Sequence, residues 1–145
     1  MHRNLVVRLL FGALALASIG LLAPGCGGGS WAYDVVGTQR DPGAEGRIQV
    51  ERIEGGNRLV TASLRHLTPP ERLGSGLSTF VMWFRDARGQ STKASLLEYD
   101  PDSRTARATA TTPMSRFVVI VTAERNGNVV EPSENVIYNQ RISAE

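Results

Sequence analysis

The chain has 145 residues, with 16 lysines and arginines against 14 aspartates and glutamates. Two of the cations, Arg3 and Arg8, lie at the start of an apolar N-terminal segment, and without that segment positive and negative side chains are equal in number. A chain with this balance lacks the excess of positive charge that binds nucleic acid, so we expect no such partner despite a pI near 9.1. The single cysteine, Cys26, excludes a disulfide within the chain.

The N-terminal 25 residues differ from the rest of the chain in composition. Two arginines precede an apolar run from Leu9 to Leu22, and this order predicts a cleaved secretory signal peptide over residues 1–25. A retained transmembrane helix is the alternative. It would need about 20 apolar residues, whereas this run is shorter and is followed by the helix breaker Pro24.

Cys26 directly follows Ala23-Pro24-Gly25. This segment resembles the lipobox of bacterial lipoproteins, in which the cysteine is lipidated and becomes the mature N-terminus, although Ala23 stands where the family has leucine. The resemblance implies a lipid on Cys26 and a place in the cell envelope. Since Gly27 rather than aspartate follows the cysteine, it also implies the outer membrane of a Gram-negative bacterium. Residues 26–31 would then be a flexible tether. The alternative is an ordinary signal peptide cut nearby, with an unmodified thiol.

Residues 32–145 show alternating apolar and polar positions separated by turn signals, without a convincing helical period. The first element is a short strand or an extended lead-in. The next shows the clearest alternation, with Ile48 and Val50 on one face. In chain order, the expected strands are Trp31–Thr38, Gly46–Ile53, Arg58–Leu67, Ser78–Arg85, Ser91–Tyr99, Thr105–Thr111, Arg116–Glu124 and Asn135–Ile142.

The strand expected over Ser78–Arg85 contains the most apolar run after the N-terminal segment. Val81 and Trp83 point to one face, and three other large apolar side chains point to the opposite face. Both faces should therefore be covered by protein. The strand expected over Thr105–Thr111 has only alanines on its apolar face, so we expect it to lie close to a bulky neighbour such as Trp83.

Seven or eight strands with regular turn signals indicate an all-β chain, folded as a single antiparallel β-sandwich over residues 32–145. A tryptophan in a central strand makes this domain similar to immunoglobulin-like sandwiches. Because the cysteine pair of antibody domains is absent, the resemblance is to cysteine-free relatives of the fibronectin type III kind. It implies a fold and no particular function.

A second resemblance covers a shorter part of the chain. Leu67-Thr68-Pro69-Pro70, followed by Phe80-Val81-Met82-Trp83-Phe84, by Gly89 and by a strand around Leu96-Leu97, is similar to the extracytoplasmic domain of anti-sigma-K factors. These motifs mark a loop and a core strand. The resemblance therefore implies a β-sandwich located outside the cytoplasm, and it implies no activity.

The sequence contains no recognisable catalytic set, cofactor motif or metal-ligand spacing. His66 is the one histidine after the N-terminal segment, and no second ligand-type residue lies at a suitable spacing from it. Asp100 and Asp102 flank Pro101 in a turn too short to supply the oxygens that calcium needs. We therefore expect a protein that is not an enzyme and that uses neither cofactor nor metal. A hydrolase with an unrecognised site is the remaining alternative.

The candidate binding surfaces are two loops, Thr68–Leu77 and Arg125–Ser133, because loops on a rigid sandwich often carry function. We expect a non-catalytic binding or structural module that presents them to an envelope protein or polysaccharide. The alternative is a small-ligand or carbohydrate-binding accessory module. That alternative requires exposed aromatic rings, for which Trp31, Tyr99 and Tyr138 are the candidates.

Overall fold

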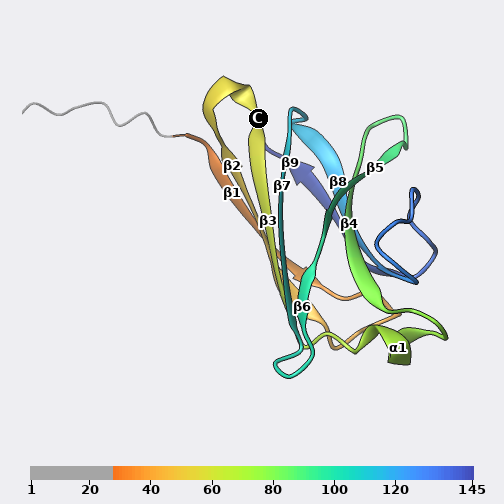
Figure 1. The fold of residues 1–145 in the computed structure, drawn as a ribbon. Coiled ribbons are helices and arrows are strands. Elements are labelled where there is room, and N and C mark those ends of the chain that lie inside the picture. The colour runs from red at the N-terminus through yellow and green to blue at the C-terminus, as the bar shows by residue number, and fades with distance from the viewer. Residues whose placement is uncertain (1–27) are drawn as a thin grey trace, which may run out of the picture.

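The computed structural model describes residues 28–145, which form two antiparallel sheets packed face to face (Figure 1). The strand order is β1-β2-β3-β7-β6 in the five-stranded sheet and β5-β4-β8-β9 in the four-stranded sheet. This arrangement confirms the prediction of an all-β chain with two antiparallel sheets. The predicted signal peptide over residues 1–25 and the predicted lipidation site Cys26 lie outside the described residues.

Nine strands are present in the described part of the chain, compared with the seven or eight expected. The elements are β1 (Ser30–Val36), β2 (Glu45–Arg52), the 3-10 turn η1 (Glu54–Gly56), β3 (Arg58–Arg65), the one-turn helix α1 (Pro70–Leu73), β4 (Thr79–Arg85), β5 (Ser91–Leu96), β6 (Glu98–Asp100), β7 (Thr105–Thr112), β8 (Arg116–Glu124) and β9 (Val136–Ser143). Strand β1 thus includes Ser30 and Trp31, the last two residues of the range expected to be a tether.

A large apolar cluster fills the space between the sheets. Ile48 and Val50 on β2 are fully buried in it, as their alternation predicts. From the four-stranded sheet, the rings of Phe84 and Phe117 meet edge to face with their centroids 5.1 Å apart. Burying a side chain of this size stabilises the fold by about 1.5–3 kcal/mol, so this inter-sheet cluster is the main source of stability.

A smaller outer cluster lies on the opposite face of the four-stranded sheet. It consists of Val81 and Trp83 on β4 and Ile120 on β8, and all three side chains are buried. Trp83 therefore points away from the alanine strand β7, and the expectation that the two lie together is wrong. The physical reason is the alternation of β4, which directs the even-numbered side chains between the sheets and the odd-numbered ones outward.

The outer cluster is covered by the connection between β8 and β9, residues 125–135, which we call the cover loop. Its Val129 packs against the outer cluster. Lys93 Nζ on β5 donates hydrogen bonds to two carbonyl oxygens of the loop, at 2.8 and 3.0 Å. At its other side, the backbone N–H of Ser133 donates to Glu124 Oε1 at 2.8 Å. The cover loop is therefore fastened along the sheet and closes an apolar surface.

The single strand expected over Ser91–Tyr99 is in fact two strands in different sheets. β5 pairs with β4, and β6 pairs with β7. Between them lies the buried Leu97, whose N–H donates to the carbonyl oxygen of Phe80 at 3.0 Å. The chain passes from one sheet to the other at this apolar, buried residue. Neither Leu97 nor Leu96 before it is one of the glycine, proline or polar residues that would indicate a turn.

Strand β9 departs from simple alternation. The register with β8 shifts between Val121 and Thr122, so β9 contains a bulge. Consequently the neighbours Ile137 and Tyr138 are both buried in the inter-sheet cluster. Simple alternation would place these neighbours on opposite faces, but a bulge adds one unpaired residue and reverses the parity of the positions beyond it.

The sandwich has two ends, which Figure 1 separates clearly. We call the end at which β1 begins the entry end; it also contains η1 and the β4–β5 turn. The opposite end, the α1 end, contains α1 and the loop Thr68–Leu77. At the entry end, the carbonyl oxygen of Gly29 already accepts a hydrogen bond from the N–H of Arg52 at 2.8 Å. The chain is therefore part of the sheet from Gly29 onward.

Candidate functional site

Two of the titratable residues singled out in the sequence, His66 and Asp100, have structural partners. His66 Nδ1 lies 3.0 Å from Glu45 Oε1, and Arg65 Nε lies 3.2 Å from the same oxygen. The hydrogen bond and charge of Arg65 lower the pKa of Glu45 below its usual range. Asp100 accepts hydrogen bonds within its own turn. In residues 28–145, no group of three histidine, cysteine or acidic side chains could hold a metal ion.

The three candidate aromatic residues pack on the inner side of the sandwich. Tyr138 is fully buried, and Tyr99 is half-buried with its ring 5.2 Å from that of Phe80. Trp31 is also half-buried, and the guanidinium of Arg52 lies 5.8 Å from the centre of its ring. None of the three lies on the outer face of a sheet, and none is exposed.

The loop Thr68–Leu77 is held firmly at its base. The carboxylate of the buried Asp41 accepts hydrogen bonds from the N–H of Thr68 at 2.8 Å and from its hydroxyl at 2.9 Å. Leu77 is buried at the other end of the loop, whereas the tip at Ser75 is exposed. This loop therefore projects an exposed tip from a rigid base. The other candidate loop, Arg125–Ser133, belongs to the cover loop; its Val129 packs on the sheet beneath it, whereas Arg125, Asn126, Asn128, Val130 and Glu131 are exposed.

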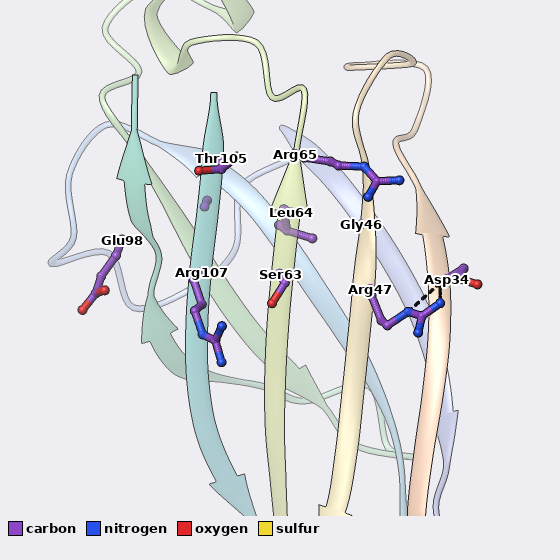
Figure 2. Close-up of a pocket in the computed structure, with 10 residues that line it drawn as sticks. Asp34, Gly46, Arg47, Ser63, Leu64, Arg65, Glu98, Thr105 and Arg107 are labelled. Atoms are coloured by element: carbon purple, nitrogen blue, oxygen red, sulfur yellow. Dashed lines mark hydrogen bonds and ion pairs between the residues drawn. The ribbon is translucent and has the colours of Figure 1, made fainter. Parts of the chain in front are cut away.

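A row of charged side chains crosses the outer face of the five-stranded sheet (Figure 2). The strand register aligns Asp34, Arg47, Ser63, Arg107 and Glu98 across five adjacent strands. They line an open hollow of about 520 Å³. Arg47 and Asp34 form an ion pair of 2.8 Å, and a carboxylate stands at each end of the row. The row itself is therefore balanced in charge, and Arg65 adds one further cation to the lining of the hollow.

The four-stranded sheet carries a second group of cations that we call the arginine patch: Arg85, Arg116 and Arg141. The register places Arg85 and Arg141 on either side of Val118, and Arg116 precedes Val118 by two residues on the same outer face. The three arginines line a hollow of about 360 Å³ whose floor includes Val118. Since they are spread over 57 residues of sequence, only the strand pairing could bring them together.

The two hollows differ in the balance of charge along their lining: three arginines and the carboxylate of Asp86 line the hollow of the arginine patch, whereas three arginines and two carboxylates line that of the charged row. Arg116 Nη2 pairs with Glu145 at 2.6 Å, and Arg85 Nε donates to the hydroxyl of Ser91 at 3.0 Å. Within residues 28–145, no carboxylate oxygen lies within 4.0 Å of the charged nitrogens of Arg85 or Arg141. This patch is therefore the better candidate for binding an anion.

Comparison with known proteins finds no family, no curated protein and no solved structure that matches this chain. In the part of the chain from residue 28 onward, no helix is long and apolar enough to cross a membrane. The function is therefore inferred from the surfaces of the sandwich and from the segment that precedes it.

Proposed function

We propose that the protein is a lipid-anchored, non-catalytic module of the cell envelope, attached through Cys26 and presenting its α1 end to an envelope protein or polysaccharide. The observation that carries the proposal is the short distance along the chain from Cys26 to the sheet. Gly29 is already hydrogen-bonded to Arg52, so only Gly27 and Gly28 lie between it and the cysteine. In a fully extended chain, the Cα atoms of Cys26 and Gly29 would be about 10 Å apart. A lipid on Cys26 would therefore hold the entry end close to the bilayer.

The α1 end suits the role of the presented surface. Its distance from the entry end is set by strands of seven to nine residues, which at about 3.3 Å per residue extend for about 25 Å. The loop Thr68–Leu77 lies at this end, with its base fixed by Asp41 and its tip exposed. Rigid loops of this kind lose little conformational entropy when they bind. We expect the host membrane to be the outer membrane of a Gram-negative bacterium.

The strand order supports a finer assignment of the domain as immunoglobulin-like. The order β2-β3-β7-β6 corresponds to strands A-B-E-D of that fold, and β4-β8-β9 corresponds to C-F-G. One feature speaks against a close relationship to antibody domains, whose strand C carries a tryptophan packed on the inter-sheet disulfide. Trp83 lies on the corresponding strand, β4, but faces outward. The relatives we propose are therefore cysteine-free sandwiches of the fibronectin type III kind.

The anchor is tested by the intact mass of the protein isolated from the native membrane fraction, compared with a Cys26→Ser variant. We expect a mass raised by a diacylglycerol group and an acyl chain, and loss of both lipid and membrane attachment in the variant. Ser30→Ala is the matched control, because it changes a neighbouring hydroxyl and keeps the cysteine. An unmodified mass, or a Cys26→Ser protein that stays on the membrane like the control, would overturn the proposal.

A further inference from the structure

We propose that the arginine patch binds the phosphate groups of anionic phospholipid headgroups, so that the sandwich docks on the membrane to which Cys26 attaches it. This inference rests on the proposed lipid anchor, because the anchor brings the patch within reach of the bilayer. It adds a defined membrane-facing surface, formed by Arg85, Arg116 and Arg141, and a chemical class of ligand.

The position of the patch supports this role. Arg85 is the last residue of β4, Arg116 is the first of β8, and Arg141 lies two residues before the end of β9. All three therefore lie at the entry end, where β1 begins and where the segment from Cys26 joins the sheet. Because that segment spans only about 10 Å, the entry end cannot move far from the lipid surface.

The charge distribution along the sandwich favours the same orientation. Six arginines and four carboxylates lie at the entry end, whereas five arginines and seven carboxylates lie at the α1 end. These counts cover residues 51–58, 85–91, 112–116 and 141–145 at the entry end, and residues 36–45, 65–79, 99–105, 123–125 and 133–136 at the α1 end; the middle of the cover loop, which lies along the sheet, is left out. An anionic bilayer attracts basic residues near its surface and repels acidic ones, so it would orient the entry end inward.

The carboxylates closest to the patch are already engaged. Glu145 pairs with Arg116, and Asp86 Oδ1 accepts hydrogen bonds from two backbone N–H groups of its own turn, both at 2.9 Å. On the same face of the sheet, the acidic residue Glu124 lies at the α1 end, where it holds the cover loop. The charges of Arg85 and Arg141 are therefore available to an external anion.

The chemistry of the patch matches a phospholipid headgroup. Guanidinium groups bind phosphate with paired hydrogen bonds, which a single ammonium group cannot do. Arg85 and Arg141 stand two strands apart, a separation of about 10 Å, with the half-buried Val118 between them. Their aliphatic stems can lie along this apolar floor while the charged groups meet phosphate at the surface.

The test uses the lipidated full-length protein in two kinds of vesicle, one of phosphatidylcholine alone and one that also contains phosphatidylglycerol. A fluorescent probe is attached through Ala87→Cys, in the exposed turn beside the patch, and a second probe through Ser75→Cys at the α1 end. Quenching by a nitroxide carried on a lipid headgroup reports the proximity of each probe to the bilayer. The Cys26 thiol is consumed by the lipid, so the new cysteine alone takes the probe.

The decisive variant is Arg85→Gln combined with Arg141→Gln. Its matched control is Arg72→Gln combined with Arg125→Gln, which removes the same charge from exposed positions at the α1 end. We expect quenching of the Ala87 probe in anionic vesicles and none of the Ser75 probe. Each arginine near an anionic surface strengthens attraction about fivefold, so the patch variant should weaken docking about thirtyfold, and the control should leave it unchanged. Circular dichroism checks that both variants are folded.

Equal quenching of the Ala87 probe in neutral and anionic vesicles, or undiminished quenching in the patch variant, would overturn the proposal. Failure of the anchor gives a different result, since a protein without lipid would not associate with neutral vesicles. If such a protein binds anionic vesicles alone and the patch variant does not, the patch is supported without the anchor. If it binds neither, both proposals are wrong.

Discussion

Thr122→Val removes one buried polar atom beside the outer cluster and changes the shape of the side chain very little. Trp83 Nε1 donates a hydrogen bond to Thr122 Oγ1 at 2.8 Å, and both side chains are fully buried. In the variant, the indole N–H would remain buried beneath the cover loop without an acceptor. Leaving a buried donor unpaired costs about 1–3 kcal/mol, so we expect the free energy of unfolding to fall by that amount.

The measurement is urea unfolding followed by tryptophan fluorescence and circular dichroism. For a domain of this size, each kcal/mol also lowers the melting temperature by about 3–6 °C. Thr109→Val, on the exposed face of β7, is the matched control and should change stability by less than about 0.5 kcal/mol. Adding Trp83→Phe to Thr122→Val removes the unpaired donor, so the two changes should be coupled by about 1 kcal/mol in a double-mutant cycle.

Wild-type stability in Thr122→Val would refute this reasoning, because it would mean that the indole N–H has no buried hydrogen bond to lose. Strict additivity in the double-mutant cycle would do the same. If Thr109→Val lost as much stability as Thr122→Val, the effect would come from the loss of a threonine hydroxyl in general and not from the hydrogen bond of Trp83.

Two further predictions concern a buried hydroxyl and an exposed carboxylate. Burial raises the pKa of Tyr138, and its hydroxyl has no hydrogen-bond partner among the described residues. Removal of this hydroxyl by Tyr138→Phe therefore breaks no hydrogen bond. In urea titrations, the free energy of unfolding should stay within about 0.5 kcal/mol of the wild-type value or rise. A loss of about 1 kcal/mol or more would show that the hydroxyl is paired. Glu45 has its pKa lowered by Arg65, so its contribution to stability is present above the ordinary value of 4.5 and is lost as the pH falls through the lower folded value. Thermal melts of Glu45→Gln should accordingly lose less stability than wild type on acidification, and an identical pH dependence would contradict this.

Local patterns were sufficient to predict much of the fold. Strands β2 and β3 follow from alternation, because Ile48 and Val50 on β2 and Val60, Ala62 and Leu64 on β3 each form one apolar face. For β8, the expected bounds Arg116–Glu124 are those observed. Gly89 has a φ of 86°, a conformation that glycine adopts easily, which explains why the turn before β5 was also recognisable.

The remaining features depend on contacts that no local pattern contains. Trp83 has an apolar environment on either side of β4, so its sequence neighbourhood is consistent with both the inter-sheet and the outer face. The apolar Val129 within a polar connection was the available signal that the cover loop packs on the sheet, although its neighbour Val130 is exposed. The arginine patch left no signal, since its members come from three strands and are joined only by register.

The cover loop divides the buried apolar surface of this protein into two parts that can be exposed separately. The loop makes no strand pairing over most of its length. Its middle is held by Lys93 and Val129, and its ends are held by hydrogen bonds that include those of Ser78, Ala123 and Glu124. The inter-sheet cluster contains none of the buried residues of the outer cluster. Detachment of the loop would therefore expose Trp83 while both sheets stay closed, which is a local opening of lower free energy than complete unfolding. In native-state hydrogen exchange, amides beneath the loop should then exchange by a subglobal route, with Trp83 as an intrinsic reporter of the opened form.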